Sequence, residues 1–190
     1  MNVDDSSGSV ADGPLSDSER ADLLLMREEE RLARDLYRRF HQAWGVPIFG
    51  NISDSEQRHH DAIGRLLERY SVPDPSAGQL PGVYADTELQ EAYDTWLARG
   101  LSSVDEAYAV GVELETGDIA DLSAAVERSD EAAIHRVYGN LRAASENHLQ
   151  AFEGSMSGRP FGGGRRRRWR GGAHGGDGYR HRGGRGRHDS

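Results

Sequence analysis

Residues 47–63 read PIFGNISDSEQRHHDAI, and their pattern predicts a helix that extends from about residue 48 to residue 70. Pro47 suits the first turn of this helix, where its missing N–H would have no partner in any case. Glu56 and His59 are three residues apart, so both project from the inner face of the helix. That face is marked by apolar residues at helical spacing: Ile52, Ile63, Leu66, Leu67 and Tyr70.

The neighbouring segments carry further helical patterns, and strand patterns are nearly absent. Ser16 and Glu19 have the spacing of a capping box and predict a helix over about 17–43. Further helices are expected over about 86–99, 103–127 and 131–153, and Gly117 is a place where the helix over 103–127 could kink. Residues 71–82 are rich in proline and glycine and must form a connection. Four long helices with one long connection predict an all-α four-helix bundle with a short extra helix in the crossover.

Composition limits the classes of protein that this chain can represent. Its 190 residues, 36% of them hydrophobic, are enough for one domain with a core. No apolar run is long enough for a transmembrane helix, and residues 1–13 lack the pattern of a secretory signal, so we expect a cytoplasmic protein without a membrane partner. The absence of cysteine excludes disulfides, thiolate metal sites and a cysteine nucleophile. A metal would therefore need histidine and carboxylate ligands.

The distribution of charge divides the chain into a long acidic part and a short basic one. Acidic residues dominate before residue 159, whereas the last stretch is mostly arginine and glycine. We expect a disordered leader over 1–15, a helical domain over 16–153 and a disordered Arg/Gly-rich tail over 154–190. Arg165–Arg168 and Trp169 combine phosphate-binding charge with a ring that stacks on bases. Residues 159–190 could therefore bind nucleic acid weakly, or serve as a solubilising tail, or lie on the acidic domain.

Each long helix carries a metal-ligand candidate on its predicted inner face. Glu30 lies on the first, Glu56 and His59 on the second, Glu115 on the helix over 103–127, and His148 on the last. Two-metal carboxylate bundles take one glutamate from each of two helices and a Glu-x-x-His pair from each of the other two. Only Glu56 and His59 form that pair here, because residue 145 is serine. Asp118 could supply the missing carboxylate, whereas Glu146 is expected to face elsewhere.

Depth in the bundle supports the same set. Residues of an antiparallel helix pair lie at equal depth when they are equally far from the turn that joins the helices. The midpoint of Glu115 and His148 falls close to the Ser129–Asp130 turn, and that of Glu30 and His59 falls within Trp44–Pro47. We therefore predict metal ligands at Glu30, Glu56, His59, Glu115 and His148, for one or two ions of iron or manganese.

Ordinary structural roles are the alternative for these residues. Arg27, Arg34 or Arg58 could neutralise the buried glutamates, and a buried His148 could hydrogen-bond a carbonyl. The neighbouring residues Glu28, Glu29 and His60 are expected to be solvated.

Four stretches resemble a known family: MREEERLARDLY (26–37), residues 47–63, GVELETGDIADL (111–122) and NLRAASENHLQAF (140–152). They are similar to the ferritin-like family called domain of unknown function 2202, over about residues 15–153. Glu30, Ala33 and Tyr37 also resemble the rubrerythrin pattern, and the absent glutamate at 145 departs from the full rubrerythrin and bacterioferritin set. The resemblance implies a ferritin-like bundle that binds iron or a related metal, and it implies no particular reaction.

Two classes of function agree with these features. The first is a metal-dependent oxidoreductase that acts on oxygen, peroxide or Fe(II), as an oxidase, peroxidase or ferroxidase, with Tyr37 or Tyr138 near the metal. The second is a non-catalytic metal-binding or scaffold bundle whose Arg/Gly tail contacts nucleic acid. A homodimer is compatible with both.

Overall fold

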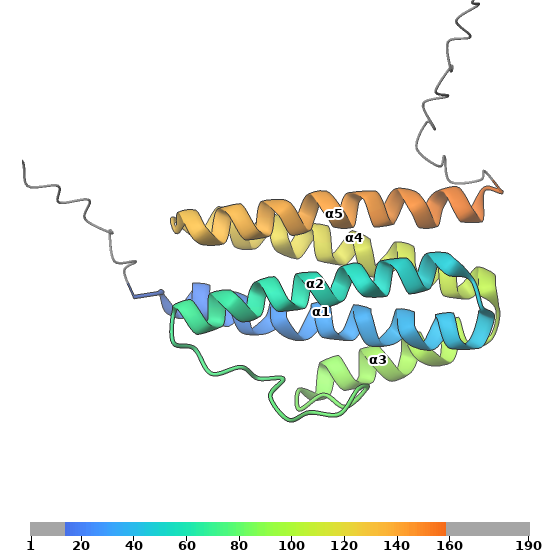
Figure 1. Cartoon of the computed structure of the whole chain (residues 1–190), viewed down its shortest axis with the longest axis horizontal. Helices are drawn as coiled ribbons and strands as arrows, with labels where there is room; N and C mark the ends of the chain where they lie inside the picture. Colours follow the sequence, from blue (N-terminus) through green and yellow to red (C-terminus); the bar gives the residue numbers. More distant parts are fainter. Residues whose placement is uncertain (1–13, 159–190) are drawn as a thin grey trace, which may run out of the picture.

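The computed structural model describes residues 14–158, which contain five helices and no strand (Figure 1). The predicted all-α class is therefore confirmed for this part of the chain. The observed ends differ from the predicted ones by three residues at most. The helices are α1 (Asp17–Trp44), α2 (Pro47–Arg69), α3 (Thr87–Gly100), α4 (Val104–Arg128) and α5 (Ala132–Met156).

The four long helices lie side by side, and the short α3 packs on the outside (Figure 1). α1 pairs with α2 and α4 pairs with α5, while α1 also contacts α4 and α2 contacts α5. α3 rests on α1 and α4. This arrangement gives the four long helices one common interior, into which each of them presents one face.

Local signals begin and end the helices as the sequence predicts. The Glu19 N–H donates to Ser16 Oγ, and the Ser16 N–H donates to Glu19 Oε2, so the capping box is present. Pro47 lies in the first turn of α2. Gly45 ends α1 with a φ of 65°, a left-handed conformation that glycine adopts without steric cost. α4 runs through Gly117 without a break.

The core consists of two apolar clusters. One gathers around Phe40, Phe49 and Phe152, and the other around Leu23, Ile63 and Leu122. Along each long helix, the predicted metal ligands lie between the residues of one cluster and those of the other. The interior is therefore apolar, then polar, then apolar along the helices.

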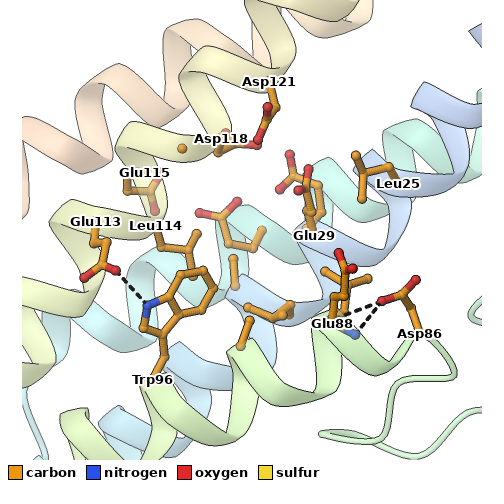
Figure 2. A pocket seen from close by; sticks show the side chains of 17 residues that line it. Leu25, Glu29, Asp86, Glu88, Trp96, Glu113, Leu114, Glu115, Asp118 and Asp121 are labelled. Atoms are coloured by element: carbon orange, nitrogen blue, oxygen red, sulfur yellow. Dashed lines mark hydrogen bonds between the residues drawn. The ribbon is translucent and has the colours of Figure 1, made fainter. Parts of the chain in front are cut away.

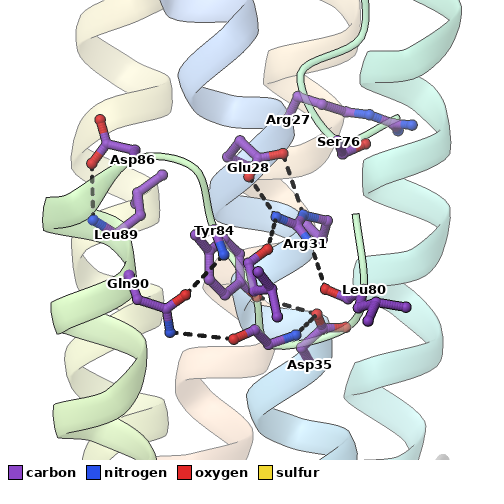
Figure 3. Close-up of polar contacts among 12 residues, drawn as sticks. Arg27, Glu28, Arg31, Asp35, Ser76, Leu80, Tyr84, Asp86, Leu89 and Gln90 are labelled. Atoms are coloured by element: carbon purple, nitrogen blue, oxygen red, sulfur yellow. Dashed lines mark hydrogen bonds and ion pairs between the residues drawn. The ribbon is translucent and has the colours of Figure 1, made fainter. Parts of the chain in front are cut away.

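The connection between α2 and α3 covers one face of α1 and α2, and it corrects one prediction. Glu28 and His60 are buried and Glu29 is half-buried, although all three were expected to be solvated. Arg31 donates to Glu28 and to the carbonyls of Leu80 and Val83 in the connection (Figure 3). Helix periodicity could not reveal the cover over Glu28 and His60, because it comes from a distant segment of the chain. Glu29 instead lines a pocket with residues of α3 and α4.

Some predictions concern residues outside the described range. The leader falls mostly in residues 1–13, and the nucleic-acid contact was predicted for residues 159–190; both ranges lie outside the described residues. None of the five described helices has the length and apolar character needed to cross a membrane.

Candidate metal centre

The interior of the bundle brings together the five predicted ligands. α1 supplies Glu30, α2 supplies Glu56 and His59, α4 supplies Glu115 and α5 supplies His148. Each exposes 9% or less of its surface. The inner faces assigned from periodicity are thus buried, and the residues meet at one level. That these side chains bind a metal stays a prediction.

The five residues form two overlapping groups that could hold a metal ion. One group is Glu30, Glu56 and His59, and the other is Glu56, Glu115 and His148. Within each group, one ligand atom from every residue lies within 4.8 Å of the others. Glu56 belongs to both groups, so its carboxylate joins them.

Short distances define the geometry around Glu56. His59 Nδ1 lies 2.7 Å from Glu56 Oε2 and 3.2 Å from Glu30 Oε2. His148 Nδ1 lies 2.8 Å from Glu56 Oε1 and 3.4 Å from Glu115 Oε2. The two imidazole rings are stacked, with their centroids 5.6 Å apart. Each imidazole therefore turns its Nδ1 toward two carboxylates.

One buried oxygen of this cluster lacks a partner. Glu30 Oε1 is buried and makes no hydrogen bond within the described part of the chain, whereas Glu56 Oε1 and His148 Nδ1 are buried against each other at 2.8 Å. An unsatisfied buried polar atom costs about 1–3 kcal/mol, and more when it is charged. A cation here would satisfy Glu30 Oε1 and replace the proton between His148 and Glu56, so the donor set fits a hard or borderline metal ion such as iron or manganese.

The arginines do not neutralise the cluster. Arg27 donates to Asp74 at 2.7 Å and to the His60 carbonyl, and Arg34 pairs with Asp35 at 2.8 Å. Arg58 is exposed. The alternative in which an arginine clasps Glu30 or Glu115 is therefore wrong for Arg27 and Arg34, whose guanidinium groups are engaged on the outside of the α1–α2 pair.

The cluster has strongly perturbed pKa values. Burial, and then the charges of Asp118 and Glu56, raise the pKa of Glu30 well above its usual value. Burial and Glu56 likewise raise the pKa of Glu115 to about 8. Burial also raises the pKa of Glu56, but His148 and His59 outweigh it and lower this pKa to about 2. Without a metal, protons must therefore balance much of the negative charge of the cluster.

His148 carries one of those protons. Burial lowers its pKa, but the nearby carboxylates of Glu115 and Glu56 outweigh burial and raise the pKa to about 10. A metal ion bound at Nδ1 would displace this proton, because only the neutral imidazole is a ligand.

A tyrosine fixes the orientation of one carboxylate. Tyr37 is fully buried and donates its hydroxyl to Glu115 Oε1 at 2.7 Å. Burial and the charge of Glu115 raise the pKa of Tyr37 well above its usual value, so it remains a donor. Tyr138, the other candidate, packs in the apolar cluster around Leu122, away from the five ligands. Tyr37 is thus the tyrosine at the site.

Two acidic residues near the missing glutamate have different positions. Glu146 is exposed and faces Arg142, as its place on α5 predicts. Asp118 is half-buried, and burial raises its pKa to about 6 although hydrogen bonding with Ser145 lowers it. Asp118 belongs to neither group of ligands, but its charge acts on Glu30 and Glu115. It therefore lies beside the centre.

A pocket of about 380 Å³ leads to the centre from outside (Figure 2). Residues of all four long helices except α5, together with residues of α3, line it, and they include Glu30, Glu56 and Glu115. The sequence reasoning did not foresee the contribution of α3, although Leu89 and Trp96 on one apolar face were the available signal.

Fold and site together define an all-helical protein with a buried cluster of carboxylates and imidazoles that could hold a metal ion. The chain belongs to the family described as uncharacterized protein domain DUF2202, whose model matches residues 19–161.

A relative from Methanocaldococcus jannaschii extends this comparison. The uncharacterized protein MJ0754 is 42% identical over 139 residues, which cover 73% of this chain and 75% of that protein. The crystal structure of hypothetical protein MJ0754 matches with a TM-score of 0.76 and 39% identity, covering 79% of this chain and 86% of that chain. The likeness supports the helical fold, and neither description assigns an activity.

Proposed function

We propose that this protein is a ferritin-like four-helix bundle that binds one or two ions of iron or manganese and uses them in a redox reaction. The single observation that carries the proposal is the convergence of Glu30, Glu56, His59, Glu115 and His148 in the buried interior, where one oxygen of Glu30 has no partner among the described residues. A cluster of this composition without a metal would only cost stability, because each buried carboxylate must be protonated or paired.

The residues of the centre have distinct roles in this proposal. The two oxygens of Glu56 each lie against a different histidine, so this carboxylate would contribute to both groups of ligands. His59 and His148 would bind through Nδ1, the atom that faces the carboxylates. Ser55 Oγ lies 3.5 Å from His59 Nε2 on the other side of the ring, and Tyr37 orients Glu115.

A bound iron or manganese ion would supply one-electron redox chemistry and polarise a coordinated oxygen ligand. The protein excludes bulk water from that chemistry with the two apolar clusters that flank the polar layer. A pocket whose lining includes Glu30, Glu56 and Glu115 gives small molecules a way to reach the ligands.

The test is the metal content of the purified full-length chain, compared with that of Glu56→Ala and His148→Ala. We expect one or two ions per chain by elemental analysis, and at least a tenfold lower content in both variants. His174, His181 and His188 are present in every version, so metal held outside the bundle does not change the difference.

The exposed Glu146 provides a matched control, and Glu146→Gln should keep full metal content. Circular dichroism of each variant shows whether the bundle is folded. Metal-dependent consumption of oxygen or peroxide, or oxidation of Fe(II), then tests the redox part. Equal metal content in Glu56→Ala and Glu146→Gln would refute the proposed centre.

A further inference from the structure

The pocket beside the centre is larger than small inorganic reactants require. Its volume of about 380 Å³ falls in the range of about 300–1,000 Å³ that is typical of sites for small organic ligands. Oxygen, peroxide or a hydrated metal ion would fill a minor part of it. The residues that line the pocket therefore indicate which kind of organic molecule could bind there.

The charged residues that line the pocket all have the same sign. Nine of its lining residues are acidic, and none of the described lining residues is basic. Three of the nine belong to the metal centre. Glu113 is paired with Arg99 at 2.7 Å, and Asp86 caps the first turn of α3. Anionic ligands are thus excluded by repulsion.

Of the four other acidic residues, Glu88 belongs to α3, and Glu29, Asp118 and Asp121 gather at one side of the opening. Figure 2 shows Glu29 on α1 facing Asp118 and Asp121 on α4. Glu29 Oε2 is buried and has no hydrogen-bond partner in the described part of the chain. Deeper in the pocket, Glu30 is 2% exposed and its Oε1 also lacks a partner. These oxygens can accept hydrogen bonds from a ligand that carries N–H donors and a positive charge.

The pocket also has an apolar lining. Leu89 and Trp96 from α3, Leu25 and Leu32 from α1, and Leu114 from α4 contribute to it. The indole of Trp96 donates to Glu113 Oε1 at 3.2 Å, which holds its ring in place. A hydrated metal ion gains nothing from such a lining, whereas an aromatic or aliphatic group would be removed from water there.

We propose that the pocket binds small organic cations, in which an ammonium group is attached to an apolar body. The ammonium group lies among Glu29, Asp118 and Asp121, and the apolar body lies against Leu89 and Trp96, next to the metal centre. This inference rests on the proposed function for the view that the ligand is a substrate. The ligand class itself can be tested with no metal present.

The test is calorimetric titration of the full-length chain with benzylammonium, benzyl alcohol and benzoate, in a chelator-treated and a manganese-loaded form. We expect benzylammonium to bind at least tenfold more tightly than benzyl alcohol, and benzoate not to bind. Asp121→Asn should weaken benzylammonium binding about fivefold in both forms. Trp96→Ala should weaken it about tenfold.

Glu127→Gln is the matched control, because Glu127 is another exposed acid on α4 and lies outside the pocket. It should bind benzylammonium as the unaltered protein does. Three outcomes would overturn the inference: equal affinity for amine and alcohol, no amine binding in either form, or the same affinity in Asp121→Asn and Glu127→Gln. Competition by Mn²⁺ that disappears in Asp121→Asn would also overturn it, since the pocket would then be a route for metal ions.

Failure of this inference is distinct from failure of the proposed function. A chain that holds metal but shows no preference for the amine contradicts only the ligand class. A chain that binds the amine at Asp121 and holds no metal contradicts only the metal centre.

Discussion

Glu56 is the residue on which both halves of the candidate centre depend. Its oxygens lie 2.7 Å and 2.8 Å from the Nδ1 atoms of His59 and His148, so one carboxylate compensates two imidazoles. Its pKa is lowered to about 2 against the effect of burial, because both histidines act on it. Among the described acidic residues of the cluster, Glu56 is thus the one that stays ionised most readily.

Tyr37→Phe should destabilise the metal-free protein by about 1–3 kcal/mol. The change removes the donor at 2.7 Å from Glu115 Oε1 and leaves a buried carboxyl oxygen without its partner. Urea denaturation of the chelator-treated protein measures this loss. Metal affinity should also fall, because Glu115 is no longer held in one orientation.

Tyr108→Phe is the matched control for this substitution. Tyr108 packs against the same apolar cluster and stacks on Phe49, but no hydrogen bond of its hydroxyl is seen among residues 14–158. Its free energy of unfolding should change by less than about 0.5 kcal/mol. Similar losses in the two variants would show that the hydroxyl of Tyr37 has no special partner.

At the scale of elements, two glycines of α4 should respond oppositely to alanine. A Cβ on Gly111 would lie 2.7 Å from the Phe152 ring on α5, so Gly111→Ala must push the two helices apart. We expect a loss of about 1–3 kcal/mol from overpacking. A Cβ on Gly117 meets nothing within 4 Å, so Gly117→Ala should stabilise the helix by about 0.5–1 kcal/mol.

Thermal or urea unfolding of both variants measures the difference. Stabilisation by Gly111→Ala would mean that α4 and α5 are not in close contact at this level. The comparison also tests whether α4 is straight at Gly117, as the structure has it, since a kink that needs glycine would make Gly117→Ala unfavourable.

The ends of the helices could be predicted closely from the sequence, but the segments that pack against their faces could not. The capping box at Ser16 and Glu19 and the position of Pro47 depend on neighbouring residues only, so the observed ends lie near the expected ones. The burial of Glu28 and His60 depends on the connection between α2 and α3, which contacts them from far along the chain. Periodicity identifies the main buried face of a helix, but not a second face that a loop covers.

At the scale of the whole molecule, the polar layer between two apolar clusters links all four long helices. In the absence of metal this layer makes stability depend on pH. The pKa of Glu115 is raised by burial and Glu56 to about 8, and that of His148 is raised by its carboxylate neighbours, against burial, to about 10. In both cases the folded protein binds more protons than the unfolded chain does.

The metal-free protein should therefore lose stability as the pH rises. The contribution of Glu115 is full below its usual pKa of 4.5 and disappears as the pH passes about 8. That of His148 is full below its usual pKa of 6.5 and disappears by about pH 10. Metal must displace these protons, so the stability added by metal should increase over the same range. Urea unfolding at about pH 6 and about pH 9, with and without manganese, measures how the metal-free stability and the stability added by metal change with pH.

The critical result is the direction in which the stability of the metal-free protein changes as the pH rises. Metal-free stability that rises between these two pH values would mean that Glu115 and His148 do not hold their protons in the folded state. The double variant Glu115→Gln with His148→Gln provides the control, because it removes both titrations and should weaken the dependence, while the raised pKa values of Glu30 and Asp118 remain.

By itself, the sequence determined which residues lie on the inner face of each long helix. Glu30, Glu56, His59, Glu115 and His148 could be placed there because helix periodicity and turn positions are local properties. Tertiary structure alone decided that Glu56 joins two groups, that Asp118 lies beside them, that Arg27 and Arg34 are engaged elsewhere, and that α3 forms a wall of the pocket. The physical reason is that these relations depend on how elements distant in the chain pack together, and that packing leaves no periodic trace in any single helix.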